Sequence, residues 1–480
     1  MPDSSSNLSR TLNPSTVVVV GDKRMNGYMW LNNMRDFTGK LYSVQVDPAE
    51  ISGIEELGVT NYTSLADVPG EIDYVLCAVP RAIAPRIIAD CAARQVGGVA
   101  LFTSGFAETG EEEGVRLQSE LGEIARRAGL ALIGPNCMGL YNAKLGVRQA
   151  GEQPIGEAGP VGFISQSGTH AINFSLTGAA QGVRISTAIS IGNAEVLDVS
   201  DYVDYLAADS DTQVIAMYVE GTKDGRRLFQ SLRRAAETKP VVIWKGGVTE
   251  AGARATASHT AALATSNEVW NAVVRQAGAI ATESMDDTID VLKALLHCKP
   301  ATGLGMGLLA MTGGQSVVIT DAFVRAGLDV PLLTDASYTE LAEFFNVIGG
   351  SSKNPLDIGG TIGFGGQHEQ LQRLLDILEA DANVDAIAME LASGFMARRW
   401  QADPASLDAL LDLLVAHQDR SAKPLVTILH PGHLEEVTSR ARARVVERGL
   451  AVFPSFERAA RALSSAIAYW RSRPSAEGEA

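Results

Sequence analysis

A single histidine, His259, lies in the stretch ATASHTAALAT (255–265), among small residues and beside no other titratable side chain. Histidine can carry a phosphoryl group, because its neutral form is abundant near pH 7 and has a nucleophilic ring nitrogen. Small neighbours let the segment approach a phosphate closely and leave it few anchoring contacts, as a residue that visits two sites requires. For any histidine taken singly, a structural or surface role is the alternative. The other six are His170, His297, His368, His417, His430 and His433.

Five strand-to-helix turns have the small and polar residues that a phosphate site needs. They are VVVVGDKRMNG (17–27), FTSGFAETG (102–110), IGPNCMG (133–139), FISQSGTH (163–170) and MTGGQS (311–316). Ligands of open α/β sheets bind outside the carboxyl ends of the strands, where helix N-termini offer free N–H groups. The five turns together indicate phosphate-bearing ligands, although helix capping by Ser165 and Ser167 is the alternative for the fourth.

The first of these turns carries two cations, Lys23 and Arg24, between Gly21 and Gly27. Its spacing is G-x5-G, so the G-x-G-x-x-G fingerprint of NAD-binding proteins is absent. A nucleotide phosphate would fit two cations in a protein that is otherwise acidic. The alternative is a tight turn with two solvated charges.

Short β-branched runs alternate with longer amphipathic segments along the chain, a pattern that predicts βα units and parallel sheets. We expect an α/β protein with three doubly wound parallel-sheet domains over residues 1–145, 158–298 and 303–475. The boundaries are placed at the polar, glycine-containing segment 143–157 and at KPATG near residues 298–303. The expected strands are 16–22, 40–46, 72–80, 97–103 and 130–133, then VGFIS, VRISTAISI, TQVIAMYVE and PVVIWKG, then LGMGLLAMT, 384–393, 423–431 and 450–455.

The composition and charge of the chain limit the kinds of partner that it can bind. The 480 residues carry a net charge of −16, which argues against a nucleic-acid or anionic-membrane surface. Four scattered cysteines form no CxxC pair and are typical of reduced core residues, so no metal site is expected. Residues 1–15 lack the apolar core of a signal peptide, and no window approaches 18 apolar residues. We therefore expect a soluble cytoplasmic protein.

Taken in order, ten segments of the chain resemble the NDP-forming acyl-CoA synthetases, and more narrowly the α subunit of ADP-forming acetyl-CoA synthetases, relatives of succinyl-CoA synthetase. The segments are VVGDKRMNG, IDYVLCAVP, TSGFAETGEE, IGPNCMGLYN, GPVGFISQSG, SIGNAEVLDVSDYVDYLAADSDTQVIAMYVEG, KDGRR, EAGARATASHTAALATS, NPLDIGG and FPSFERAARAL. The resemblance runs from about residue 16 to residue 471. It implies a Rossmann-like CoA-binding domain followed by two flavodoxin-like, succinyl-CoA synthetase-like domains.

The resemblance also implies roles for individual residues. His259 would be the phosphorylated histidine, and Glu220 would accept a hydrogen bond from its ring and fix its orientation. The implied CoA-binding residues are Gly21, Asp22, Lys23, Arg24, Gly27, Val46, Pro48, Val79, Pro80, Thr103, Ser104, Gly105, Phe106, Asn136 and Cys137. The implied phosphate- and acyl-binding residues are Ser165, Gln166, Ser167, Gly168, Thr169, Gly313 and Gly314.

Three departures from the family pattern bear on these roles. Ala261 and Asn267 replace the glycine and aspartate that usually follow the histidine, so phosphorylation of His259 is less assured. Thr169-His170-Ala171 replaces Ala-Leu-Gly, which argues for an acid other than simple acetate, although His170 as an inert, half-buried residue is an equal alternative. Asp-Lys-Arg replaces Ala-Ser in the first turn, where it could alter how the CoA phosphates are held.

No segment resembles the ATP-grasp domains that handle the nucleotide in this family. The resemblance therefore implies an ATP-grasp β subunit as partner, which would supply ATP or ADP and magnesium, in an α2β2-type assembly or with a homodimer of this chain. The expected function is that of the α-type subunit of an acid–thiol ligase acting on a small carboxylic acid, with CoA as co-substrate. Two alternatives stay open: a nucleotide-independent acyl or carbamoyl transferase, and a non-catalytic CoA-binding regulatory protein.

Overall fold

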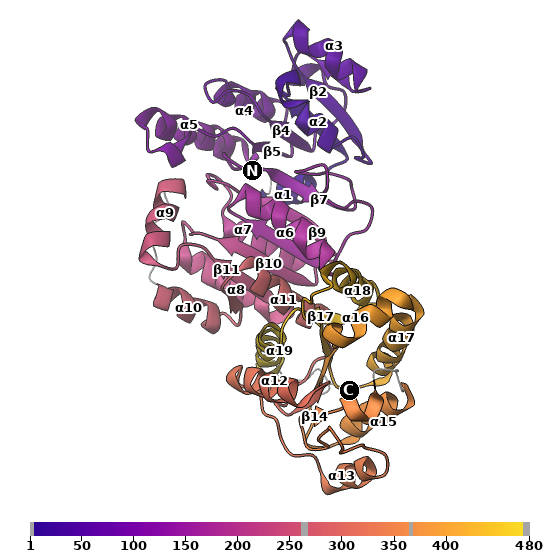
Figure 1. Cartoon of the computed structure of the whole chain (residues 1–480). Helices are drawn as coiled ribbons and strands as arrows, with labels where there is room; N and C mark the ends of the chain where they lie inside the picture. Colours follow the sequence, from indigo (N-terminus) through magenta and orange to yellow (C-terminus); the bar gives the residue numbers. More distant parts are fainter. Residues whose placement is uncertain (1–3, 261–266, 364–367, 474–480) are drawn as a thin grey trace, which may run out of the picture. The chain divides into compact units, whose positions relative to one another are not determined.

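The computed structural model describes residues 4–260, 267–363 and 368–473, without the side chains of residues 4–6 and 257–260. It contains three parallel α/β sheets, which confirms the expected fold class (Figure 1). The chain divides into two compact units, Met1–Ala179 with Arg184–Met285, and Ala180–Val183 with Asp286–Ala480. The first unit holds the first two sheets, and the second unit holds the third.

The first sheet has the strand order β3-β2-β1-β4-β5-β6. Residues 17–20, all valine in β1, are buried, as expected for a strand that helices cover on both faces. The strands are β1 (Thr16–Val20), β2 (Lys40–Val44), β3 (Thr60–Tyr62), β4 (Tyr74–Cys77), β5 (Gly98–Leu101) and β6 (Ala131–Ile133).

The helices of this domain include three short 3₁₀ turns. They are α1 (Ser4–Leu12), η1 (Arg24–Asn26), α2 (Met29–Asn33), α3 (Pro48–Glu56), η2 (Leu65–Asp67), α4 (Ala84–Ala93), η3 (Ala107–Thr109) and α5 (Glu112–Ala128). Helix α5 has two glutamates in its first turn and two arginines in its last, the distribution that the helix dipole favours.

The second sheet has the order β12-β11-β10-β8-β9-β7 and is parallel except at one edge, where β7 pairs with β9 in antiparallel register, Gly139 opposite Ser190. Its strands are β7 (Gly139–Asn142), β8 (Val161–Ser165), β9 (Ile185–Ser190), β10 (Val214–Val219), β11 (Val241–Lys245) and β12 (Ile280–Thr282). Its helices are α6 (Gly168–Ala180), α7 (Val199–Ala208), α8 (Gly225–Thr238), α9 (Glu250–Thr260), α10 (Asn267–Gln276) and α11 (Met285–His297).

The polar segment 143–157 is buried at residues 146–149 and at Gln153 and exposed at residues 151–152 and 154–157. Gln149 and Gln153 are buried, and the Gln153 side-chain oxygen accepts a hydrogen bond from the Gln149 N–H at 2.7 Å. The Arg148 guanidinium forms an ion pair with Asp36 at 2.6 Å. Because these side chains make hydrogen bonds or an ion pair within the protein, they can be buried where composition alone suggests an exposed linker.

The third sheet has the order β14-β13-β15-β16-β17. Its strands are β13 (Met306–Ala310), β14 (Leu356–Asp357), β15 (Ala386–Glu390), β16 (Leu425–Ile428) and β17 (Ala451–Phe453). Its helices are α12 (Gly313–Arg325), α13 (Asp335–Ala342), α14 (Gly359–Ile362), α15 (His368–Ala380), α16 (Ser393–Ala402), α17 (Pro404–Arg420), α18 (Glu435–Glu447) and α19 (Phe456–Arg471). Separate apolar clusters pack on the two faces of this sheet, as a doubly wound fold requires. Within the described part of the chain, no helix is both long enough and apolar enough to cross a membrane.

Candidate active site

A pocket of about 220 Å³ lies where the N-terminus of α6 meets the turn that follows β6. It brings together two stretches that the sequence analysis names separately, Asn136-Cys137 and Gln166–Thr169. This position, at the carboxyl ends of β8 and β9, is the usual ligand site of open α/β sheets. The lining residues are Phe102, Asn136, Cys137, Met138, Gln166, Ser167, Gly168, Thr169, Gly192 and Asn193.

Gly192 and Asn193 form a wall of this pocket that the sequence analysis does not name. Gly192 has φ of +51°, and a Cβ there would lie 2.3 Å from the carbonyl oxygens of Pro135 and Asn136. Only glycine tolerates both conditions. The signal is present in SIGN (190–193), where a glycine follows a buried strand as it does in the five turns named above.

A hydrogen-bond network ties this wall to the first domain. The Asn193 side-chain N–H₂ donates to Glu108 Oε2 at 2.6 Å and to Gln118 Oε1 at 2.8 Å. The other Glu108 oxygen accepts from the Gly105 N–H at 2.6 Å. Glu108 therefore holds the predicted CoA-binding segment 103–106 next to the pocket.

The N-terminus of α6 forms the second wall. Ser165 Oγ accepts a hydrogen bond from the Ser167 N–H at 3.1 Å, and Ser167 Oγ accepts from the His170 N–H at 3.3 Å. A Cβ at Gly168 would lie 2.6 Å from the Met138 side chain, so only glycine fits there. First-turn N–H groups have no partner within a helix, which makes this wall suited to a phosphate or a carboxylate.

Cys137 lines the pocket but has an unreactive thiol. The residue is buried, and its Sγ lies 3.5 Å from the carbonyl oxygens of Leu101 and Ile133. Burial raises the pKa of the Cys137 thiol to about 12, which keeps it protonated. Its side chain can shape the pocket but is not a nucleophile.

Glu220 follows β10 and is buried, at 8% exposure. Its side-chain Oε1 accepts a hydrogen bond from the Tyr218 hydroxyl at 3.1 Å. Its backbone N–H and that of Gly221 both donate to Gln166 Oε1, the latter at 2.9 Å. Because Gln166 also lines the pocket, one side chain connects the pocket with the predicted carboxylate.

His259 lies in the last turn of α9, and its side chain is outside the described part of the structure. Residue 261 also falls outside that part, while Asn267 begins α10. Helix α9 lies against η3, the 3₁₀ turn that carries Glu108. The helix with the predicted phosphohistidine is therefore adjacent to the segment that borders the pocket.

The Gly21–Gly27 turn exposes the two cations that the sequence singles out, Arg24 fully and Lys23 in part. Asp22 is different, because its carboxylate is buried and accepts hydrogen bonds from the Leu31 N–H at 2.9 Å and the Lys23 N–H at 3.1 Å. Burial raises the pKa of Asp22, and these N–H groups oppose that effect. Asp22 thus fixes the turn, and any contact it makes with CoA is indirect.

The two glycines of this turn allow a matched test. Gly21 has φ of +87°, and a Cβ there would lie 2.7 Å from the Val79 side chain, whereas Gly27 has φ of +63° and open space around it. We expect Gly21→Ala to lower the free energy of unfolding by about 2–3 kcal/mol and to weaken CoA binding, because strain and steric conflict combine. Gly27→Ala should cost only about 1 kcal/mol. Thermal unfolding measures the stability of the two variants, and calorimetric titration measures their affinity for CoA. Equal losses in Gly21→Ala and Gly27→Ala would contradict the role of the Val79 contact.

The remaining predicted CoA residues differ in accessibility. Val46 is 69% exposed and Pro48 begins α3, so both lie at the surface where β2 ends. Val79 and Phe106 are buried, and contact from Phe106 would have to come from its backbone. Pro80 and Ser104 are both exposed. Thr103 donates a hydrogen bond from its hydroxyl to the Val79 carbonyl at 2.5 Å, which joins the ends of β4 and β5.

In the second unit, Gly313 and Gly314 begin α12 behind the cap Thr312, whose hydroxyl accepts from the Gln315 N–H at 3.3 Å. A Cβ at Gly314 would meet nothing within 4 Å, so this helix end is open. Burial raises the pKa of two nearby carboxyl groups, those of Asp357 and Glu390, and favours their neutral forms.

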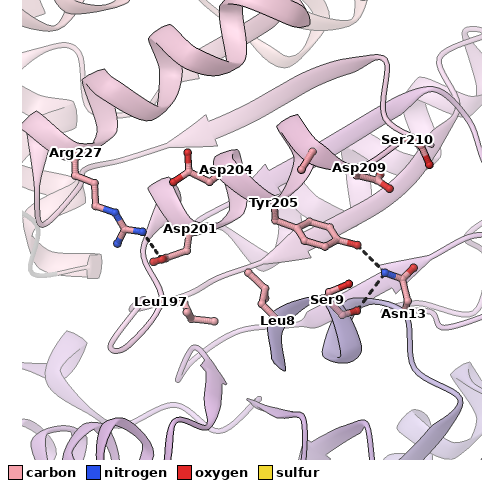
Figure 2. Close-up of a pocket in the computed structure, with 11 residues that line it drawn as sticks. Leu8, Ser9, Asn13, Leu197, Asp201, Asp204, Tyr205, Asp209, Ser210 and Arg227 are labelled. Carbon is pink, nitrogen blue, oxygen red and sulfur yellow. Dashed lines mark hydrogen bonds and ion pairs between the residues drawn. The ribbon is translucent and has the colours of Figure 1, made fainter. Parts of the chain in front are cut away.

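A larger pocket, of about 550 Å³, lies between α1 and α7 and contains none of the predicted residues (Figure 2). Three aspartates of this region line it, and two of them form ion pairs with arginine: Asp201 with Arg227 at 2.6 Å and Asp204 with Arg234 at 2.7 Å. A surface of this charge does not suit a phosphate. Among the described residues, no group of three or more His, Cys, Asp or Glu side chains is arranged to hold a metal ion.

Two family models match the chain. A CoA binding domain matches residues 15–143, and a succinyl-CoA ligase like flavodoxin domain matches residues 158–295. The fold and the pocket thus define a protein that joins a CoA-binding domain to a succinyl-CoA ligase-like domain.

Curated relatives and solved structures narrow this class. The chain is 33% identical to acetate–CoA ligase [ADP-forming] I of Archaeoglobus fulgidus over 79% of its own length, and it spans 54% of that protein. It is 30% identical to the α subunit of acetate–CoA ligase [ADP-forming] I of Pyrococcus furiosus, covering 95% of this chain and 96% of the subunit. It resembles the dinucleotide forming acetyl-coenzyme A synthetase 1 of Ca. Korarchaeum cryptofilum, solved with phosphate and ADP, with a TM-score of 0.82, 29% identity and 97% of each chain covered. The chain belongs to the NDP-forming acyl-CoA synthetase family. The two relatives named above are ADP-forming CoA ligases.

Proposed function

We propose that the chain is the α-type part of an NDP-forming acyl-CoA synthetase that interconverts acyl-CoA, NDP and phosphate with a carboxylic acid, CoA and NTP. One observation carries the proposal. The pocket joins Asn136 and Cys137 to the N-terminus of α6, and the Gln166 side chain links that pocket to the backbone N–H of Glu220, directly after the neighbouring strand β10. This is where a thioester, a phosphate and a histidine would have to meet.

In the direction of acid formation, the reaction would proceed in three steps. A phosphate oxygen attacks the thioester carbonyl, the CoA thiol leaves with a proton, and an acyl phosphate forms. A ring nitrogen of His259 then attacks phosphorus and the carboxylate leaves. The phosphoryl group finally passes from His259 to NDP. The N–H groups at the start of α6 would stabilise the charge of the transferred group, which is the main catalytic requirement of phosphoryl transfer.

Coenzyme A fits the residues of the first domain. The exposed Arg24 and the partly exposed Lys23 would pair with CoA phosphates, and the open Gly27 backbone would allow a close approach. We expect Lys23→Ala and Arg24→Ala each to weaken CoA binding about 5- to 10-fold at low salt, and less at high salt because the charges are exposed. Calorimetric titration at two ionic strengths measures this. Binding that is unchanged in both variants would place the CoA phosphates elsewhere.

The nucleotide half of the reaction would require a second polypeptide or domain. We propose an ATP-grasp β subunit that supplies ATP or ADP with magnesium, in an α2β2-type assembly or with a homodimer of this chain. The named α subunit among the relatives supports a separate partner. We expect the chain alone to bind CoA but to show no ATP-dependent synthesis, and addition of the β partner to restore it. Synthesis by the chain alone would contradict this and would favour the nucleotide-independent transferase.

The acid would be a small carboxylic acid other than simple acetate, because Thr169 lines the pocket and presents a hydroxyl group where alanine is usual, which changes the polarity of the site. A panel of acids offered to the complete complex identifies it. A protein that binds CoA but gives no turnover with any acid or partner would instead be a CoA-binding regulator.

A further inference from the structure

Three aromatic rings contact one another beside Glu220. They belong to His170 in the first turn of α6, Tyr218 on β10 and Trp244 on β11. The ring centroids are 4.5 Å apart for His170 and Tyr218, 4.6 Å for His170 and Trp244, and 4.5 Å for Tyr218 and Trp244. Tyr218 and Trp244 are register partners on adjacent strands, so the backbone itself sets their spacing.

The Tyr218 hydroxyl is confined on two sides. It donates a hydrogen bond to Glu220 Oε1 at 3.1 Å, and a Cβ at Gly246 would lie 2.5 Å from it. Burial, together with the nearby Glu220 carboxylate, raises the pKa of Tyr218 above its ordinary value. The hydroxyl therefore remains a donor throughout the physiological pH range.

The backbone of Glu220 is held as firmly as this carboxylate oxygen. Gln166 Oε1 accepts from its N–H, and Lys245 Nζ donates to its carbonyl oxygen at 2.6 Å. With the main chain fixed on both sides, the hydrogen bond from Tyr218 is one constraint on the direction of the carboxylate. A catalytic group held in this way needs little reorganisation before it acts.

We propose that Tyr218 is a positioning residue for Glu220, and that the His170 and Trp244 rings clamp Tyr218 in place. The inference rests on the proposed role of Glu220 in orienting the phosphorylated histidine. It assigns a function to His170, the residue that departs from the usual leucine at this position. His170 acts through Tyr218, and the imidazole itself does not take part in the chemistry.

The test is Tyr218→Phe, which removes one oxygen atom and keeps the ring packing. We expect the rate of phosphoryl transfer to His259 to fall about tenfold, with the KM for CoA and the melting temperature unchanged. Labelled phosphate and acyl-CoA mixed with the full chain, in single-turnover experiments, measure the rate. Tyr141→Phe is the matched control, because the buried Tyr141 hydroxyl donates to the Pro154 carbonyl at 2.7 Å, away from Glu220.

Two further variants separate positioning from a general structural effect. In a Glu220→Ala background, which removes the group that accepts from Tyr218, Tyr218→Phe should cause no further loss if it acts through Glu220. His170→Leu, which restores the usual residue, should slow transfer by about threefold or less and leave CoA binding unchanged. Equal losses from Tyr218→Phe in both backgrounds, or no loss in the wild-type background, would overturn the inference. If Glu220→Gln itself had no effect, the proposed role of Glu220 would fail instead.

Discussion

Replacement of His259 by alanine is expected to abolish the phosphorylated form of the chain and to lower the rate of acyl-CoA synthesis by at least about 10³-fold. The imidazole is the covalent carrier of the phosphoryl group in the proposed reaction, and no residue of the bare segment ATASHTAALAT could replace it. The variant should still bind CoA with unchanged affinity, because the Gly21–Gly27 turn lies on the other domain of the same unit.

Two labelling experiments measure this effect. In the first experiment, labelled ATP, magnesium and the β partner phosphorylate His259 from the nucleotide. In the second, labelled phosphate and acyl-CoA phosphorylate His259 by way of the acyl phosphate. Both should give an acid-labile label on the wild type and none on His259→Ala. His433→Ala is the control, because His433 is exposed and lies in the other unit. A label of equal size on His259→Ala would show that another residue carries the phosphoryl group.

The central strands of all three sheets could be predicted because their sequences are continuous β-branched or apolar runs. Residues 17–20 are four consecutive valines, a run typical of a strand that is covered on both faces, and the structure buries all four. Four of the six edge strands, β3, β7, β12 and β14, are two to four residues long and are not predicted from the sequence, whereas the edge strands β6 and β17 are. A segment such as Thr60–Tyr62 is too short to carry a period and becomes a strand through pairing with β2.

The strand β7 shows a second limit of prediction from sequence. It lies within the predicted first domain, 1–145, yet it joins the second sheet, in antiparallel register with β9. Register of this kind depends on contacts between residues far apart in the sequence, which composition cannot report. The segment 143–157 is similar, because composition suggests a solvated linker, whereas Arg148, Gln149 and Gln153 are buried.

Individual residues of the candidate site could be predicted from the sequence better than the contacts between them. The strand–glycine–helix pattern identifies residues 136–137 and 166–169, and the structure brings these into one pocket. The sequence gives no reason to connect Glu108 with Asn193, or Tyr218 with Glu220, because those hydrogen bonds depend on which strands are neighbours. The direction of a side chain could not be predicted either. Asp22 lies in a loop, where a carboxylate is usually exposed, but its side chain is buried.

Glu220→Gln is expected to lower the rate of phosphoryl transfer to and from His259 by on the order of 10²-fold. The substitution keeps the size of the side chain and an oxygen that can accept from Tyr218, but it removes the negative charge. A carboxylate next to an imidazole orients the ring and stabilises the positive charge that the ring carries while the phosphoryl group is transferred. A neutral amide can supply the first effect in part and cannot supply the second.

The two effects can be separated by comparing the steps of the reaction. Formation of acyl phosphate from acyl-CoA and phosphate does not involve His259, so CoA release should proceed at the wild-type rate in the first turnover of Glu220→Gln. Labelling of His259 should then be slow, and acyl phosphate should accumulate. Glu237→Gln, on the exposed face of α8, is the control for loss of one negative charge. Equal slowing of CoA release and labelling would place Glu220 in the thioester step, and wild-type rates in both would remove it from the reaction.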